Sequence, residues 1–287
     1  MSIRNLREEA QRPAAGGNDA WQPREYGLWT AAAPFAETGD ELLTEHFLPS
    51  DDGIARLTDV AEPTITFFPV CGSGPHPAVL VCPGGAYELL AWDLEGRDIC
   101  SYFNSIGFAA FLLKYRCPKR RAAAHADAAR AMRLIRAHAE FFGIHPAQLG
   151  CLGFSAGAHL TASIAAPAES EPYPATDEAD RLPFRPNFIG LIYPAYLCDC
   201  DAGLTLHPEF RIDADTPPAF LVQTADDPAK VENALGWCRA LKNASVPAEL
   251  HIFSEGGHGY GIRRSGKPVA DWPLLAADWF RRQVKMP

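Results

Sequence analysis

The sequence predicts an α/β fold, with a mostly parallel sheet of about seven strands and helices on both faces. Short apolar runs alternate with longer helical patterns along most of the 287 residues, which is typical of strand–helix–strand units with right-handed crossovers. Several of the apolar runs contain no polar residue, as expected for strands that are buried on both faces. We expect strands near residues 64–70, 78–82, 108–113, 148–152, 187–192, 218–224 and 248–253, and helices near residues 93–105, 124–142, 156–166, 229–243 and 271–284.

The first 60 residues differ from the rest of the chain. They contain Gly16-Gly17, several prolines and mixed charge, which favour irregular structure. We therefore expect residues 1–60 to form an N-terminal arm or cap with little regular structure, and residues 61–287 to form the α/β domain. Within this domain, the strand from Thr64 to Val70 is expected at the edge of the sheet.

The charge and hydropathy of the chain exclude several classes of protein. A formal net charge of −9 argues against a nucleic-acid surface and against strong attraction to anionic membranes. No apolar run approaches the length of a transmembrane span, and no basic region followed by an apolar segment opens the chain. We expect a cytoplasmic protein that binds neither nucleic acid nor membranes, and association into a homo-oligomer is left open.

The eight cysteines do not form a metal-binding pattern. Most are scattered, and several lie in apolar runs, where a reduced thiol behaves as a small hydrophobe. The one cluster, Cys198-Asp199-Cys200-Asp201, lacks a second ligand pair at the spacing of a zinc site. We therefore expect no bound metal.

The apolar run at residues 78–82 opens into the loop Pro83-Gly84-Gly85-Ala86-Tyr87. Glycines allow the backbone to turn its N–H groups toward a site at the sheet edge, which a side chain would obstruct. The N–H of Gly85 is therefore a candidate donor to a bound oxyanion, and Gly84 is the alternative donor.

The pentapeptide Gly153-Phe154-Ser155-Ala156-Gly157 follows an expected strand and precedes an expected helix. Strand, tight turn and helix form a nucleophile elbow, in which the serine has a strained backbone and side chains at the flanking glycines would collide with neighbouring elements. Ser155 is therefore the candidate nucleophile. The N–H of Ala156, at the helix N-terminus, is the expected second oxyanion donor beside Gly85.

Two further strands end in residues that could complete this chemistry. The strand at 218–224 leads to Asp226-Asp227, and the strand at 248–253 leads to a loop that contains His258. His258 would take the proton of Ser155 as general base, and an aspartate would accept a hydrogen bond from the other imidazole nitrogen. The order serine, aspartate, histidine is that of one serine hydrolase fold, and either aspartate satisfies it.

Several motifs together resemble a known group of enzymes. They are Pro83-Gly84-Gly85-Ala86-Tyr87, Glu95-Gly96, Leu113-Lys114-Tyr115-Arg116, Asp127 with residues 130–136, residues 153–160, Asp226-Asp227-Pro228 and Gly256-Gly257-His258-Gly259. The chain resembles the esterase/lipase group of α/β-hydrolases over roughly residues 60 to 285, in the BD-FAE-type branch with acetylxylan-esterase-like and feruloyl-esterase-like members. The resemblance implies hydrolysis of small or carbohydrate-linked acyl esters, often acetyl esters of sugars, through an acyl-enzyme and without a metal or an organic cofactor.

The resemblance also bears on individual residues. In the related prolyl-oligopeptidase-like branch, the motif Thr-Ala-Asp-Asp carries the catalytic residue at its first aspartate, which implies Asp226 here and leaves Asp227 as a turn or capping residue. Gly84 and Tyr87 are the expected substrate-binding residues.

Four other residues are expected to be structural. His159, one turn after Ser155, is expected to be a core histidine bonded to a neighbouring loop. Glu95, Arg116 and Asp127 are expected to form structural ion pairs.

Two alternatives remain. An arylformamidase or a small-peptide hydrolase would use the same triad, and a non-catalytic binding protein of this fold would lack a triad member. Reaction with a fluorophosphonate probe separates an enzyme from a binding protein.

Overall fold

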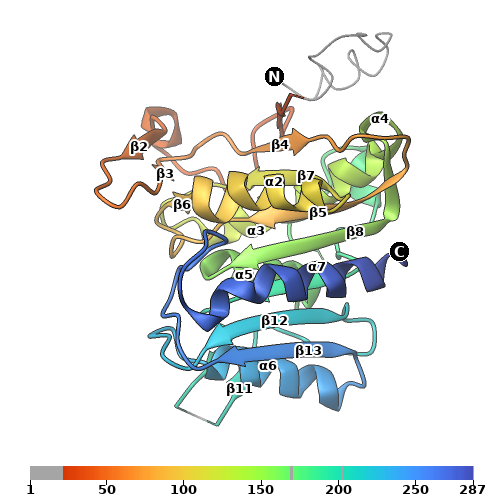
Figure 1. Ribbon diagram of the computed structural model, residues 1–287. Helices are drawn as coiled ribbons and strands as arrows, with labels where there is room; N and C mark the ends of the chain where they lie inside the picture. The colour runs from red at the N-terminus through yellow and green to blue at the C-terminus, as the bar shows by residue number, and fades with distance from the viewer. Residues whose placement is uncertain (1–21, 169–170, 202, 287) are drawn as a thin grey trace.

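The central element of the fold is a sheet of eight strands (Figure 1). A computed structural model describes residues 22–168, 171–201 and 203–286 of the protein. The strand order is β1-β4-β7-β5-β8-β9-β12-β13, and the six strands from β7 to β13 are parallel. The strands are β1 (Arg24–Gly27), β4 (Thr64–Phe68), β5 (His76–Cys82), β7 (Ala109–Lys114), β8 (Ile144–Phe154), β9 (Ile189–Ile192), β12 (Ala219–Thr224) and β13 (Ala248–Phe253). This is the α/β-hydrolase architecture that the sequence predicts.

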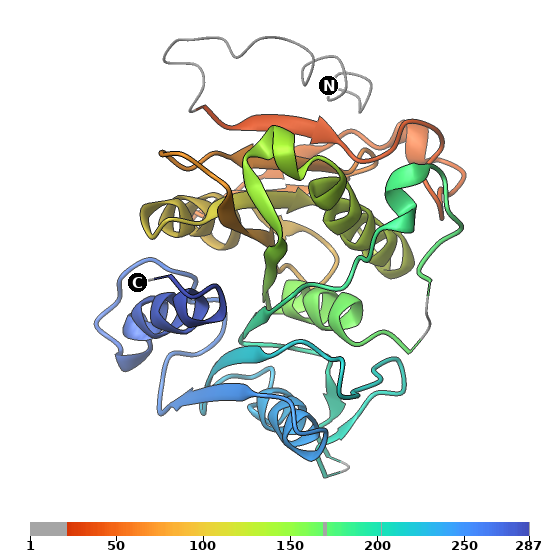
Figure 2. The ribbon, with the colours of Figure 1, turned by 90° about the vertical axis from the view of Figure 1, so that its right-hand side faces the viewer.

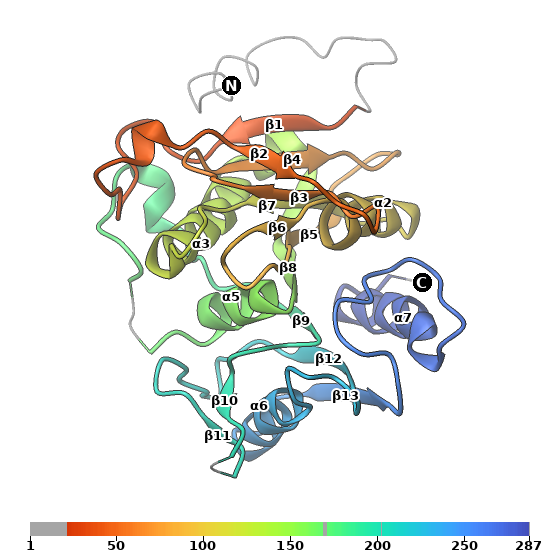
Figure 3. The ribbon, with the colours of Figure 1, turned by 90° about the vertical axis from the view of Figure 1, so that its left-hand side faces the viewer.

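Helices cover both faces of this sheet. The view in Figure 3 places α3, α5 and α6 on one side of the strands and α2 and α7 on the other, and Figure 2 shows the same two layers from the opposite side. The helices are α2 (Asp98–Ser105), α3 (Arg121–Ala137), α4 (Ala139–Phe142), α5 (Ala156–Ala165), α6 (Glu232–Asn243) and α7 (Trp272–Gln283). Shorter turns are η2 (Asp40–Leu42), the π-helix η3 (Asp93–Arg97), η4 (Glu178–Arg181) and η5 (Pro268–Asp271).

The described part of the N-terminal segment is more regular than expected. Residues 22–60 were predicted to be an arm or cap, yet β1 pairs antiparallel with β4 and forms the edge of the main sheet in place of β4. A second, three-stranded sheet joins β2 (His46–Leu48) and β3 (Arg56–Thr58) to β6 (Leu90–Ala91). The boundary expected at residue 60 is therefore wrong, because strands on either side of it share hydrogen bonds. Residues 1–21 lie outside the described residues.

A buried ion pair also holds this segment to the sheet. The Arg116 guanidinium donates to both oxygens of Asp127, at 2.8 and 2.9 Å, which is a structural ion pair as the sequence predicts, and both side chains are buried. Trp29 Nε1 donates to the same carboxylate at 2.9 Å, and Arg116 also donates to the Pro34 carbonyl. The N-terminal segment thus supplies part of the hydrogen bonding that keeps a buried charge pair satisfied.

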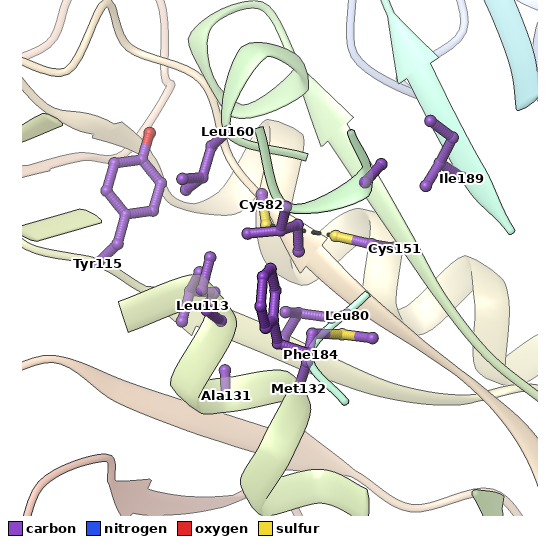
Figure 4. Packing of buried hydrophobic residues seen from close by; sticks show 14 of the residues in the cluster. Leu80, Cys82, Leu113, Tyr115, Ala131, Met132, Cys151, Leu160, Phe184 and Ile189 are labelled. Atoms are coloured by element: carbon purple, nitrogen blue, oxygen red, sulfur yellow. Dashed lines mark hydrogen bonds between the residues drawn. The ribbon is translucent and has the colours of Figure 1, made fainter. Parts of the chain in front are cut away.

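The apolar core consists of two layers, one on each face of the sheet. The inner parallel strands β5, β7, β9 and β12 are almost fully buried, as their apolar sequences predict, whereas the edge strand β13 is partly exposed. Figure 4 shows part of the layer beneath α3 and α5, including Cys82 of β5, Cys151 of β8 and Met132 of α3. All eight cysteines are free thiols. A separate two-stranded sheet pairs β10 (Cys198–Asp199) with β11 (Thr205–Leu206) in antiparallel orientation.

Candidate active site

Ser155 occupies a sharp turn between β8 and α5. Its φ and ψ are 51° and −117°, a region that side-chain-bearing residues rarely adopt and that is associated with functional strain. A Cβ at Gly153 would collide with the Gly157 carbonyl, and one at Gly157 would collide with the Cys82 carbonyl. The strained serine and the steric need for both glycines agree with the predicted nucleophile elbow.

His258 reaches Ser155 from the loop that follows β13. Its Nε2 lies 2.7 Å from the Ser155 Oγ, although the two residues are 103 positions apart in the chain. The imidazole is partly exposed, with 29% of its side-chain surface accessible. The serine and histidine that the sequence predicts are therefore brought together with the geometry of a nucleophile and its base.

The aspartate beside His258 is Asp227, and the prediction of Asp226 is wrong in this respect. Both Asp227 oxygens lie 2.9 Å from His258 Nδ1. The carboxylate is buried and also accepts from Gln223 Nε2 at 2.9 Å and from the Ala229 N–H at 2.7 Å. An ionised Asp227 requires Nδ1 to carry a proton, so that Nε2 is free to accept the Ser155 proton.

Asp226 points away from the imidazole and is exposed. Its two oxygens accept from the N–H groups of Gly257, at 2.8 Å, and Gly256, at 3.2 Å. The Gly257 hydrogen bond is the largest cause that holds the pKa of Asp226 below its ordinary value. The two aspartates lie in the turn after β12, which ends at Thr224, and of the two only Asp227 bonds to the His258 ring. Asp226 instead fixes the loop that carries His258.

The loop after β5 lies beside this triad. Gly85 has φ 133°, and Ala86 and Tyr87 both adopt left-handed φ values of 57° and 63°. No residue in the described ranges accepts a hydrogen bond from the Gly85 N–H or the Ala156 N–H, which leaves both donors available to a ligand.

The position of Gly84 contradicts its predicted role. Its N–H donates to Glu95 Oε2 at 2.6 Å, and its carbonyl accepts from the Ala91 N–H. Gly84 is therefore not the alternative oxyanion donor, because its only N–H is already used. Glu95 lies on η3, and within the described ranges it has no ion-pair partner, contrary to prediction.

Tyr87 is more buried than a substrate-stacking residue should be, with 2% of its surface exposed. Its hydroxyl lies 2.7 Å from His159 Nδ1, and His159 Nε2 lies 2.6 Å from Glu209 Oε1. Burial lowers the pKa of His159. His159 is thus a core histidine bonded to a neighbouring loop, as predicted, and Tyr87 reaches the protein surface only as one wall of a cavity.

That cavity has a volume of ≈ 440 Å³. Its wall includes Tyr87 and His159, the N-terminal residues of α3 such as Arg121, and Glu209. The Arg121 guanidinium lies over the rings of Tyr87 and Tyr196, at 5.1 and 4.8 Å from their centroids. Residues 167–168 and 208–209, which lie in the long connections before and after β9, therefore border a hollow that adjoins the first turn of α5.

Three residues at the site carried no predicted role or a different one. Gln223 supports Asp227, Glu95 holds Gly84, and Glu209 holds His159. A polar side chain inside an otherwise apolar strand is the signal that could have indicated Gln223, since such groups are buried only with a partner. Glu209 lies in an irregular loop and gives no comparable signal.

Two further features of the described residues concern metal binding and membranes. No group of three or more histidine, cysteine, aspartate or glutamate side chains in these residues is arranged to hold a metal ion. No helix in the described part of the chain has the length and hydropathy needed to cross a bilayer.

One family model and two curated proteins match the sequence of this chain. The BD-FAE family model matches residues 66–179. An acetylxylan esterase from Xylanibacter ruminicola is 29% identical over 237 residues, which is 74% of this chain and 45% of that protein. Endo-1,4-beta-xylanase B from Butyrivibrio fibrisolvens is 29% identical over 208 residues, which is 64% of this chain and 32% of that protein. The chain therefore spans less than half the length of these two curated relatives.

Solved structures agree with the fold. The acetyl ester-xyloside bifunctional hydrolase from Caldicellulosiruptor lactoaceticus has a TM-score of 0.74 and 28% identity, and the match covers 92% of this chain and 97% of that one. Esterase Est2 from Thermogutta terrifontis has a TM-score of 0.68 at 21% identity, with 84% and 92% of the two chains covered, and at this identity it supports the fold alone. With the eight-stranded sheet and the nucleophile elbow, these matches show the α/β-hydrolase fold and a similarity to the BD-FAE family over residues 66–179.

Proposed function

We propose that the protein is a serine esterase that acts through an acyl-enzyme. The observation that carries this proposal is the continuous hydrogen-bonded series from Ser155 Oγ through His258 to the buried Asp227. This series ends on a serine in a strained turn at a helix N-terminus. All three members of a triad are present, which argues against a non-catalytic binding protein.

In the proposed mechanism, His258 Nε2 removes the proton of Ser155 as Oγ attacks the ester carbonyl carbon. The N–H groups of Gly85 and Ala156 donate to the oxyanion that forms on the carbonyl oxygen. Collapse of this intermediate breaks the bond to the alcohol oxygen, which takes the proton from His258 and leaves as the free alcohol. Water then attacks the acyl-enzyme with His258 again as base, and the acid is released.

Asp227 has two roles in this scheme. It accepts the Nδ1–H of His258 and so fixes the tautomer in which Nε2 is basic, and it stabilises the imidazolium that exists between the two proton transfers. Gln223 and the Ala229 N–H hold the carboxylate in place through both oxygens.

The substrates that we propose are acetyl and other short acyl esters of small alcohols or sugars. Two relatives support this class by their names, an acetylxylan esterase and an acetyl ester-xyloside bifunctional hydrolase. The cavity of ≈ 440 Å³ beside Tyr87 is within the size range of small-molecule sites. An arylformamidase or a small-peptide hydrolase is the alternative that would use the same residues.

Because all eight cysteines are free thiols, we further propose a reducing compartment such as the cytoplasm.

Labelling with a fluorophosphonate probe and steady-state kinetics test this function. Ser155→Ala should lower ester hydrolysis and labelling by about 10⁴-fold to 10⁶-fold, because the nucleophile is removed. Ser101→Ala is the control, since Ser101 is an exposed serine of α2 whose hydroxyl donates to the Arg97 carbonyl. Undiminished turnover in folded Ser155→Ala protein would end the proposal.

A substrate panel then separates the acyl classes. We expect kcat/KM to be higher on acetyl esters of small alcohols and xylo-oligosaccharides than on acyl chains longer than about eight carbons or on N-formyl aromatic amides, because the names of two relatives indicate acetyl esters. A preference for the formamide would favour the arylformamidase alternative, and a preference for long chains would favour a lipase.

A further inference from the structure

Glu95 is a buried carboxylate that the triad does not use. It lies on the π-helix η3 with 4% of its surface exposed, and its pKa is raised by burial. Its Oε2 accepts the Gly84 N–H at 2.6 Å, and its Oε1 accepts the Tyr193 hydroxyl at 2.8 Å. Within the described ranges no cation pairs with it. Burying a carboxylate without a counter-ion is costly, so a side chain of this kind usually has a specific task.

The first partner of Glu95 belongs to the oxyanion loop. Gly84 immediately precedes Gly85, the proposed donor, and it packs so closely that a Cβ on Gly84 would lie 2.9 Å from the Ser155 Cβ and 2.6 Å from Glu95 Oε2. The Glu95 bond holds the Gly84 N–H, and the Ala91 N–H holds the Gly84 carbonyl, which shares its peptide plane with the Gly85 N–H. The hydrogen bond to Glu95 therefore fixes the position of the residue that precedes the Gly85 donor beside Ser155.

The second partner lies against the catalytic histidine. The Tyr193 ring is fully buried, and its centroid is 5.0 Å from the centroid of the His258 ring. Its hydroxyl also accepts the N–H of Gly261, three residues after His258, at 3.2 Å. Tyr193 has a φ of 38°, and such strain persists only where the surrounding structure enforces it.

We propose that Glu95 is a positioning residue, which links the oxyanion loop to the surface on which the His258 ring packs and so sets the distance between donor, nucleophile and base. This inference rests on the proposed function. It requires a carboxylate, because both contacts need an acceptor oxygen. A glutamine offers one acceptor and one donor, so it can keep the Gly84 bond only by leaving the proton of the Tyr193 hydroxyl without its acceptor.

The test compares Glu95→Gln with Asp93→Asn, a matched control two residues earlier on η3. Asp93 accepts from the Ala55 and Leu94 N–H groups and pairs with Arg263, and it touches neither Gly84 nor Tyr193. The measurements are the second-order rate constant of fluorophosphonate labelling, and kcat and KM for p-nitrophenyl acetate. Labelling reports the oxyanion site and the nucleophile whichever ester is the natural substrate.

Glu95→Gln should lower the labelling rate and kcat by about 10-fold to 100-fold, because displacement of a catalytic group by about 1 Å costs up to that much. KM should change by less than about threefold, since no contact with bound substrate is removed. Asp93→Asn should keep both rates within about twofold of wild type, since its contacts lie outside the site. Wild-type rates in folded Glu95→Gln protein, or an equal loss in Asp93→Asn, would overturn the inference.

Tyr193→Phe provides a second, milder variant. It removes one of the two bonds to Glu95 but keeps the ring beneath His258, and it should lower the labelling rate by roughly threefold to tenfold, the equivalent of one lost hydrogen bond. If Glu95→Gln does not fold, this variant decides, and an unchanged rate refutes the role of Glu95. Absence of labelling in the wild-type protein is a distinct result that would remove the proposed function itself and this inference with it.

Discussion

The choice between two adjacent aspartates is the clearest single-residue feature of the site. Asp227 is buried, receives hydrogen bonds from Gln223, Ala229 and His258, and is the acid of the series. Asp226 is exposed and holds the N–H groups of residues 256 and 257. Both act on His258, one directly on the ring and the other through the loop that carries it.

This arrangement predicts unequal effects for two matched substitutions. Asp227→Asn should lower kcat by roughly 10⁴-fold, because an amide favours the wrong imidazole tautomer and cannot stabilise the imidazolium. Asp226→Asn should lower kcat by less than about tenfold, since its hydrogen bonds are exposed and asparagine keeps one acceptor oxygen. Steady-state kinetics on p-nitrophenyl acetate provide the comparison. The opposite ranking would return the catalytic role to Asp226.

At the scale of elements, the turn between β8 and α5 depends on close backbone contact. Gly157, in the first turn of α5, faces the carbonyls of Cys82 and Pro83 at the end of β5, with no room for a Cβ. The first turn of α5 therefore packs directly against the end of β5, which precedes the loop of the proposed Gly85 donor. A glycine here is a packing requirement between two elements.

We expect Gly157→Ala to lower the free energy of unfolding by at least about 2 kcal/mol, because overpacking against rigid backbone costs about 1–3 kcal/mol or more. Gly266→Ala is the control, since a Cβ there would meet nothing within 4 Å. It should be neutral or slightly stabilising. Urea denaturation of both variants measures the difference, and equal stabilities would show that α5 can shift away from β5 at little cost.

At the scale of the whole molecule, the layer formed by α3 and α5 contains a buried histidine, one of whose ring nitrogens has no hydrogen-bond partner in the described residues. His125 on α3 has a buried Nε2 with no hydrogen-bond partner in the described residues, and burial lowers its pKa to about 4. Its surroundings include His159, Glu209 and Ser163, all from α5 or the loop beside it. The folded protein therefore favours the neutral imidazole more strongly than the unfolded chain does.

The sign of the resulting pH dependence follows from linkage. Between the ordinary histidine pKa of 6.5 and the folded value of about 4, the unfolded chain binds more protons, so stability is lost as the pH falls through this range. The loss from this group should reach about 3 kcal/mol, at about 1.4 kcal/mol for each pKa unit. Unfolding free energies of wild type and His125→Gln, measured from about pH 7 to about pH 4, should converge as the pH falls. Parallel pH profiles would contradict this assignment.

Local sequence patterns determined much of this protein. From β4 onward, the strands of the main sheet and its helices lie close to where apolar runs and helical periodicity predict them, because strands buried on both faces require apolar sequence. The glycines around Ser155 and the loop context of His258 predicted two members of the site, since the elbow depends on steric requirements within five residues. Comparison with solved structures confirms the predicted α/β-hydrolase fold, and the BD-FAE family model matches residues 66–179.

Tertiary structure alone decided the features that depend on distant partners. Which aspartate faces His258 follows from how the end of β12 is rotated toward a loop about thirty residues away, and both aspartates suit the local sequence equally well. The Gly84 N–H is taken by Glu95 from η3, and β1 joins the sheet only because the exposed edge of β4 offers it hydrogen bonds. Local sequence predicts backbone geometry and burial. It cannot predict which of two neighbouring polar groups is hydrogen-bonded to a given partner, because that depends on how elements far apart in the chain pack together.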